Sequence, residues 1–148
     1  MKFIGSLYVP NARSHDYLEA FRQLLKANAL PMDGTRVQAL LLFAIGLHMS
    51  DFEAESAEVM RDVARLACDL GMNRNEYATH FGNASPVLEE VWRRTWWEVF
   101  VTDAFFTGVN PNHYTLVLCD IKQDVFLPCE EVQFMTGVSM NMTINVRC

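Results

Sequence analysis

The residues that could do chemistry most directly are histidines and carboxylates that share a helix face. The pairs His15/Glu19 and Glu76/His80 are each spaced i, i+4, which places two side chains on one side of a helix. Neither pair has the Glu-x-x-His spacing of di-iron bundles or the His-Glu-x-x-His motif of zinc proteases. Because common residue types reach such spacings by chance, we predict no metal site in this chain.

Nucleophilic catalysis needs a serine or cysteine held beside a base. The sequence contains no Gly-x-Ser-x-Gly elbow, no P-loop and no dinucleotide fingerprint. Its cysteines form no Cys-x-x-Cys pair and are sparser than in a disulfide scaffold; they are Cys68, Cys119, Cys129 and Cys148. We therefore expect free thiols, no catalytic residue, no bound cofactor and no enzyme activity.

Charge and composition narrow the function classes further. The 148 residues carry a formal net charge of −6 and no run of Lys or Arg, so the sequence shows no concentration of cations that would displace counterions from nucleic acid. A hydrophobic fraction of 51% excludes a disordered chain. The most apolar run, residues 37–49, is shorter than the roughly 20 residues that span a membrane. We expect an intracellular chain without a membrane segment.

The spacing of apolar residues predicts that most elements of the chain are helices. We expect a helix capped by Ser14, and then a buried helix that opens on a capping box of Thr35 and Gln38. A third helix begins among the carboxylates of residues 51–58 and ends at Gly71, where a left-handed residue is needed. The remaining expected elements are a short helix in 73–81, a long helix from Ser85-Pro86 to Thr107 or Gly108, a turn at 110–112, and an irregular stretch at 112–135 with an extended piece at 114–118.

The long helix carries a pair of arginines with carboxylates one turn before them. Glu89/Arg93 and Glu90/Arg94 are i, i+4 pairs in the favourable order, each worth about 0.2–0.5 kcal/mol on an exposed helix. These arginines could bind an effector or a partner. The ordinary base rate for surface charges favours solvent-exposed pairs that stabilise the helix.

Large apolar side chains follow two sides of the same helix. One side has Trp92, Trp96, Val99 and Phe106, and the other has Trp97, Val101, Ala104 and Phe105. Such stripes could line a small-molecule pocket, but large aromatics more often form core, and we favour core. Among them lies Asp103, whose carboxylate needs a partner or a proton if it is buried. We expect a structural partner on another helix.

Three ordered segments resemble the fungal-specific transcription factor domain, the middle region of binuclear zinc cluster regulators. They are Val37-Gln38-Ala39-Leu40-Leu41-Leu42, Ala64-Arg65-Leu66-Ala67-Cys68-Asp69-Leu70-Gly71-Met72-Asn73-Arg74, and Glu89-Glu90-Val91-Trp92-Arg93-Arg94-Thr95-Trp96-Trp97 with Asp103 beyond. The last is similar to the family's Glu-x-x-Arg-Arg-x-Trp-Trp signature. Asp120-Ile121 through Leu127-Pro128 resembles the Asp-Ile-Asp … Leu-Pro that follows it. The family's Gly-Arg-Pro after the long helix is replaced here by Gly108-Val109-Asn110-Pro111.

The resemblance implies an all-α, irregular multi-helix array that is part of a regulatory domain, over residues 14–135, with an irregular tail at 136–148. It implies a nuclear protein that regulates transcription by RNA polymerase II. In such proteins a zinc cluster of six cysteines reads DNA, and this sequence lacks that cluster. The resemblance implies that this region senses effectors or modulates activation. A small-molecule effector, a protein partner and dimer formation remain open. The alternative is a small helical ligand- or protein-binding module without a transcriptional role.

Overall fold

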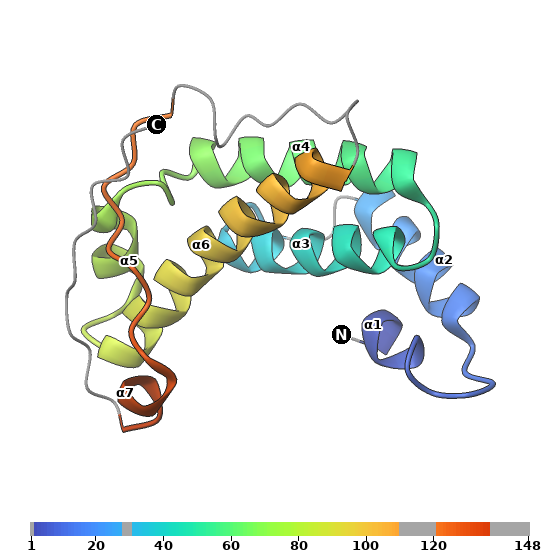
Figure 1. The fold of residues 1–148 in the computed structure, drawn as a ribbon, viewed down its shortest axis with the longest axis horizontal. Coiled ribbons are helices and arrows are strands. Elements are labelled where there is room, and N and C mark those ends of the chain that lie inside the picture. The colour runs from blue at the N-terminus through green and yellow to red at the C-terminus, as the bar shows by residue number, and fades with distance from the viewer. Residues whose placement is uncertain (1, 28–30, 110–120, 137–148) are drawn as a thin grey trace. The chain divides into compact units, whose positions relative to one another are not determined.

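The computed structural model describes residues 2–27, 31–109 and 121–136, and this part of the chain forms helices and no strand (Figure 1). The all-α fold expected from the sequence is confirmed. The chain divides within the fourth helix into two compact units, which are Met1–Val63 and Ala64–Cys148. The described helices are α1 (Lys2–Ser6), α2 (Ser14–Lys26), α3 (Gly34–His48), α4 (Glu53–Asp69), α5 (Asn75–Phe81), α6 (Pro86–Val109) and α7 (Glu131–Thr136).

The first unit is built around an apolar cluster that joins α1, α2 and α3. Its buried members are Phe3, Leu18, Phe43 and Leu47. The ring of Phe21 on α2 packs against that of Phe43, with centroids 4.5 Å apart. Burial of large apolar side chains supplies most of the favourable free energy of such a unit, so the apolar stripe of α2 has the role that its spacing predicts.

The short helix α1 was not predicted, and it changes how α2 begins. Gly46 on α3 lets α1 approach closely, because a Cβ there would lie 2.6 Å from the ring of Phe3. The hydroxyl of Ser14 donates to the carbonyl of Ser6 at 3.2 Å. The N-cap position of α2 belongs to Arg13. The predicted Ser14 cap is therefore wrong, since that hydroxyl bonds to the carbonyl at the end of α1.

The N-terminus of α3 is capped by Asp33, two residues before the start of the predicted capping box. Its carboxylate accepts hydrogen bonds from the amides of Thr35 (2.9 Å) and Arg36 (3.3 Å). The Thr35 hydroxyl donates to the same carboxylate at 2.6 Å, so it is not the cap, and the Thr35/Gln38 assignment is wrong. These bonds, above all that from the Thr35 hydroxyl, lower the pKa of Asp33. The predicted burial of α3 is confirmed at positions that include Val37, Leu41 and Leu47.

In the second unit the end of α4 matches the prediction closely. Gly71 has φ +78°, the left-handed conformation that favours glycine. Its amide donates to Cys68 O, and the amide of Met72 donates to Ala67 O, both at 2.9 Å. This pair of bonds is a Schellman motif, which satisfies carbonyls at the end of a helix. The chain can then turn directly into the short helix α5.

The long helix α6 begins where Ser85-Pro86 indicates, and its far end is within two residues of the prediction. The hydroxyl of Ser85 accepts from the amide of Leu88 at 3.4 Å, as an N-cap does. The predicted irregular stretch 112–135 is wrong at its end, because α7 begins at Glu131. The predicted turn at 110–112, the extended piece at 114–118 and residues 137–148 of the tail lie outside the described residues.

Candidate functional site

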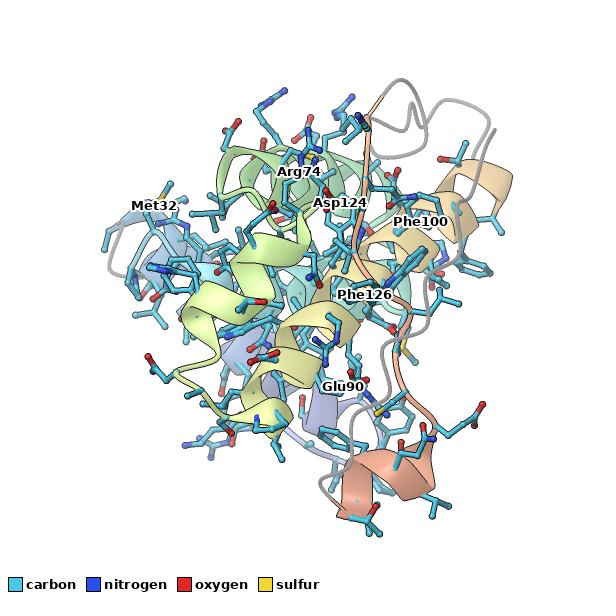
Figure 2. The ribbon with its side chains drawn as sticks, turned by 90° about the vertical axis from the view of Figure 1, so that its left-hand side faces the viewer. Met32, Arg74, Glu90, Phe100, Asp124 and Phe126 are labelled. Carbon is cyan, nitrogen blue, oxygen red and sulfur yellow. The ribbon has the colours of Figure 1, made fainter. Side chains whose placement is uncertain are left out.

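An extended segment, residues 121–130, crosses the second unit beside α6 and leads into α7 (Figure 1); we call it the strap. Its first half is bonded to the turn before α5. The amide of Asp124 donates to Asn73 O at 3.2 Å, and the Asn73 side chain donates to Lys122 O at 2.9 Å. The Asp124 carboxylate accepts from the amide of Asn75 at 2.8 Å and lies 3.7 Å from the guanidinium of Arg74 (Figure 2).

The two adjacent tryptophans of α6 hold the middle of the strap. The indole N–H of Trp96 donates to the Gln123 side chain at 3.0 Å. The indole N–H of Trp97 donates to the backbone carbonyl of Phe126 at 2.8 Å. Trp96 is fully buried. Each ring therefore combines apolar packing with one directed hydrogen bond, which is how buried tryptophan usually satisfies its N–H.

A buried carboxylate fixes the far end of the strap. Glu90 is 2% exposed, and its Oε1 accepts from the amide of Cys129 at 2.8 Å. Nε of Arg94 donates to the same oxygen at 3.1 Å, and a terminal nitrogen of Arg94 donates to Cys129 O at 3.0 Å. Burial alone would raise the pKa of Glu90. The Cys129 amide and the two arginines Arg93 and Arg94 outweigh burial and lower it, so the carboxylate is held ionised.

Arg93 is the second partner of this carboxylate and is itself buried. It is 3% exposed, with its Nε 3.0 Å from Glu90 Oε2 and a terminal nitrogen 3.6 Å from Glu89. The predicted i, i+4 pairings with Glu89 and Glu90 are present. The prediction that Arg93 is a solvent-exposed charge is wrong, because Glu90 and Arg93 are buried together. A buried pair of this kind tolerates the loss of one partner poorly.

Arg94 extends the same contacts to α7. Its guanidinium donates to Glu131 at 2.9 Å and lies over the ring of Phe134, 4.3 Å from the centroid. The hydrogen bond that Arg94 donates to Glu131, with those it donates to Glu90 and Cys129, raises the pKa of Arg94 above its ordinary value. One side chain therefore contacts α6, the strap and α7, and α7 depends on it for both a charged and an aromatic contact.

Asp103, the last residue of the expected signature, lies elsewhere on α6. It is 1% exposed. Its charge and that of Asp69 add to burial, the largest cause, in raising the pKa of Cys68. The pKa of Cys129 is also raised, first by burial. Both thiols are therefore held in the protonated form that is poorly nucleophilic.

The two apolar sides of α6 have different surroundings. Trp96, Val99 and Phe106 are buried, as a core stripe should be. On the other side Val101 is 58% and Phe105 56% exposed, so the core interpretation is wrong for these two. An open cavity of about 420 Å³ lies on that side, between α6 and the junction of the strap with α7. It is lined by Arg94, Trp97, Glu98, Val101, Pro128, Cys129, Glu130 and Glu131.

Within residues 2–27, 31–109 and 121–136, no three His, Cys, Asp or Glu side chains gather as a metal site would require. No helix in the same ranges has the length and apolarity that crossing a bilayer demands.

In the second unit, residues of the Glu-x-x-Arg-Arg-x-Trp-Trp motif on α6 hold the strap that follows. The family match agrees: residues 5–147 match the fungal specific transcription factor domain, and the chain belongs to that family. A particular relative is the C6 finger domain transcription factor iacK of Pestalotiopsis fici, which is 39% identical over 139 residues. That alignment covers 93% of this chain and 20% of the relative, so the chain spans a fifth of that protein's length. No solved structure matches the chain.

We call Glu90 and the α6 residues that bond to it or to the strap, namely Arg93, Arg94, Trp96 and Trp97, the clamp. The sequence identified the last four of these residues but missed what they hold, and it grouped them with Asp103, which lies further along α6. Glu90, at the centre of the clamp, was present as the first residue of the quoted motif. Its acceptor role could be suspected from a glutamate placed three and four residues before two arginines, but its burial could not.

Proposed function

We propose that this chain is a segment of the regulatory region of a fungal transcription regulator, acting in the nucleus and modulating activation without catalysis. Residues 14–135 would form the partial regulatory domain. DNA would be read by a zinc cluster outside these residues, and zinc would be bound there. The family membership supports this proposal, as does the relative, which is described as a C6 finger domain transcription factor.

The observation that carries the proposal is the clamp between α6 and the strap. The motif that resembles the family signature and the motif that follows it about 30 residues later are joined by the bonds of Glu90, Arg94 and Trp97. We propose that Arg93, Arg94, Trp96 and Trp97 act structurally, by fixing the strap and α7, rather than by binding a ligand. An effector or partner would then act on a preformed helical surface.

A transcriptional reporter tests this role. The full chain is fused to a heterologous DNA-binding domain and expressed in a fungal host with the matching reporter. We expect the fusion to change transcription relative to the DNA-binding domain alone. Glu90→Gln, which breaks the clamp, should abolish that change, whereas Glu53→Gln, an exposed position on α4, should preserve it. A fusion that leaves transcription unchanged would favour a helical binding module with no transcriptional role.

A further inference from the structure

The cavity beside α6 combines an apolar floor with an acidic rim; we call its eight lining residues the acidic groove. From α6 it takes Arg94, Trp97, Glu98 and Val101, which follow the i, i+3, i+4, i+7 spacing of one helix face. The opposite wall is residues 128–131 at the junction of the strap and α7. The groove is open in this structure, so no side chain of either wall has to move to create it.

The apolar floor of the groove, Trp97 and Val101, continues along α6 beyond the cavity. Trp97 is fixed by its bond to Phe126 O and by an edge contact with Phe100, whose ring centroid is 5.5 Å away. Val101 follows it by one turn, and Phe105 follows Val101 by another, both more than half exposed. An apolar strip of this spacing along one helix suits the i, i+3, i+4 anchors of a second amphipathic helix. The strip extends over about two helical turns, which suits a helix better than a compact small molecule.

The rim sets the charge of the occupant. Glu98, Glu130 and Glu131 are all exposed carboxylates. The cation among the lining residues is Arg94, and its donors are already directed at Glu90, Glu131 and the carbonyl of Cys129. Three carboxylates thus face one engaged guanidinium, and the groove has an excess of negative charge. Such a rim attracts cationic partners and repels acidic ones.

We propose that the acidic groove binds a basic amphipathic helix of a partner protein. Its apolar side chains would cover Trp97, Val101 and Phe105, and its Lys or Arg side chains would face Glu98 and Glu130. This proposal names the class of partner that the regulatory segment would bind. Its biological role rests on the proposed function, whereas the binding itself depends on the groove alone.

A designed peptide tests the proposal on the purified full chain. The probe is a fluorescently labelled 14-residue helix with leucine on one face and lysine on the other, titrated by fluorescence anisotropy. The matched probe has glutamate in place of every lysine. We expect saturable binding of the Leu/Lys peptide, weakened by salt because surface charges are screened, and no binding of the Leu/Glu peptide. Binding of both peptides with equal affinity would overturn the proposal.

Paired variants separate the groove from the net charge of the chain. Glu98→Gln with Glu130→Gln removes two rim charges and should weaken binding by about three- to tenfold. Glu53→Gln with Glu58→Gln removes the same charge from exposed positions on α4 and should leave the affinity unchanged. Equal losses in both double variants would overturn the proposal, because the groove would then contribute nothing specific.

Two further measurements address the apolar floor and the competing ligand class. Val101→Ser, at an exposed position that should leave the fold intact, is expected to weaken the peptide, and an unchanged affinity would count against the proposal. Saturable binding of phenylethylammonium without binding of the peptide would overturn the helix in favour of a small-cation pocket. Peptide binding is read on the purified chain and the reporter in cells, so either hypothesis can fail without the other.

Discussion

The side-chain oxygen Oε1 of Glu90 accepts a hydrogen bond from the backbone amide of Cys129, 39 positions further along the chain, at 2.8 Å. The other carboxylate oxygen accepts from Nε of Arg93 at 3.0 Å. Because an ionised carboxylate only accepts hydrogen bonds, it can meet the Cys129 amide and the guanidinium donors at once without a mismatched pair. One buried side chain therefore connects the charge pattern of α6 with the position of the strap.

Glu90→Gln should destabilise the second unit strongly. The amide keeps the shape but removes the charge, and its NH2 group would face the donors of Arg93 or the Cys129 amide. Breaking a buried ion pair by removing one partner typically costs about 3–5 kcal/mol. Urea unfolding of the full chain measures the difference. Glu98→Gln, the same change at an exposed position of α6, should stay within about 0.5 kcal/mol of the wild type; equal behaviour of the two variants would contradict the clamp.

The same carboxylate predicts how stability depends on pH. The native pKa of Glu90 lies below its ordinary value because the Cys129 amide and the arginines outweigh burial. The unfolded chain binds the proton more readily, so the stabilisation is present above the ordinary glutamate pKa, about 4.3, and is lost as the pH falls towards the lower native value. Urea midpoints between pH 7 and pH 3 should decline more steeply for the wild type than for Glu90→Gln. Parallel declines would assign the acid sensitivity to other carboxylates.

The sequence could predict elements whose causes are local. Gly71 was placed correctly because a helix end followed by a left-handed residue is a property of a few adjacent positions. The same is true of the start of α6 at Ser85-Pro86. Ser14 was assigned wrongly as a cap because its hydroxyl bonds to Ser6 O, which belongs to α1. A helix of five residues is too short to be recognised from its periodicity.

The clamp shows the limit of spacing as a predictor. The i, i+4 relation of Glu90 and Arg94 is readable from the sequence, and the ion pair is present. Whether that pair is exposed depends on residues 121–130, which lie about 30 positions away and cover it only in the folded chain. The prediction that Val101 and Phe105 belong to the core was wrong for the same reason. An apolar stripe in the sequence does not show which elements pack against it.

Trp97→Phe should loosen the strap while keeping an aromatic side chain at this position. The substitution deletes the N–H that donates to Phe126 O at 2.8 Å, and a lost hydrogen bond of this kind costs about 0.5–1.5 kcal/mol. Amide hydrogen exchange should accelerate at Asp124 and Cys129, whose N–H groups bond the strap to its neighbours. Trp92→Phe is the matched control, because the Trp92 N–H donates to Phe81 O in α5 and does not contact the strap. If the amides of Asp124 and Cys129 exchanged faster in Trp92→Phe but not in Trp97→Phe, Trp97 would not be the residue that holds the strap.

Gly71→Ala and Gly108→Ala form a pair that isolates backbone conformation from packing. A Cβ added at either position meets no heavy atom within 4 Å, so neither change creates a clash with a neighbour. Gly71 has φ +78°, which an L side chain adopts at a cost of about 1–2 kcal/mol. Gly108 lies in the last turn of α6, where alanine should be neutral or should stabilise by up to about 1 kcal/mol. Thermal unfolding of the two variants should therefore shift in opposite directions, or only for Gly71→Ala. A Gly71→Ala variant as stable as the wild type would show that the turn after α4 reaches its Schellman bonds without the left-handed residue.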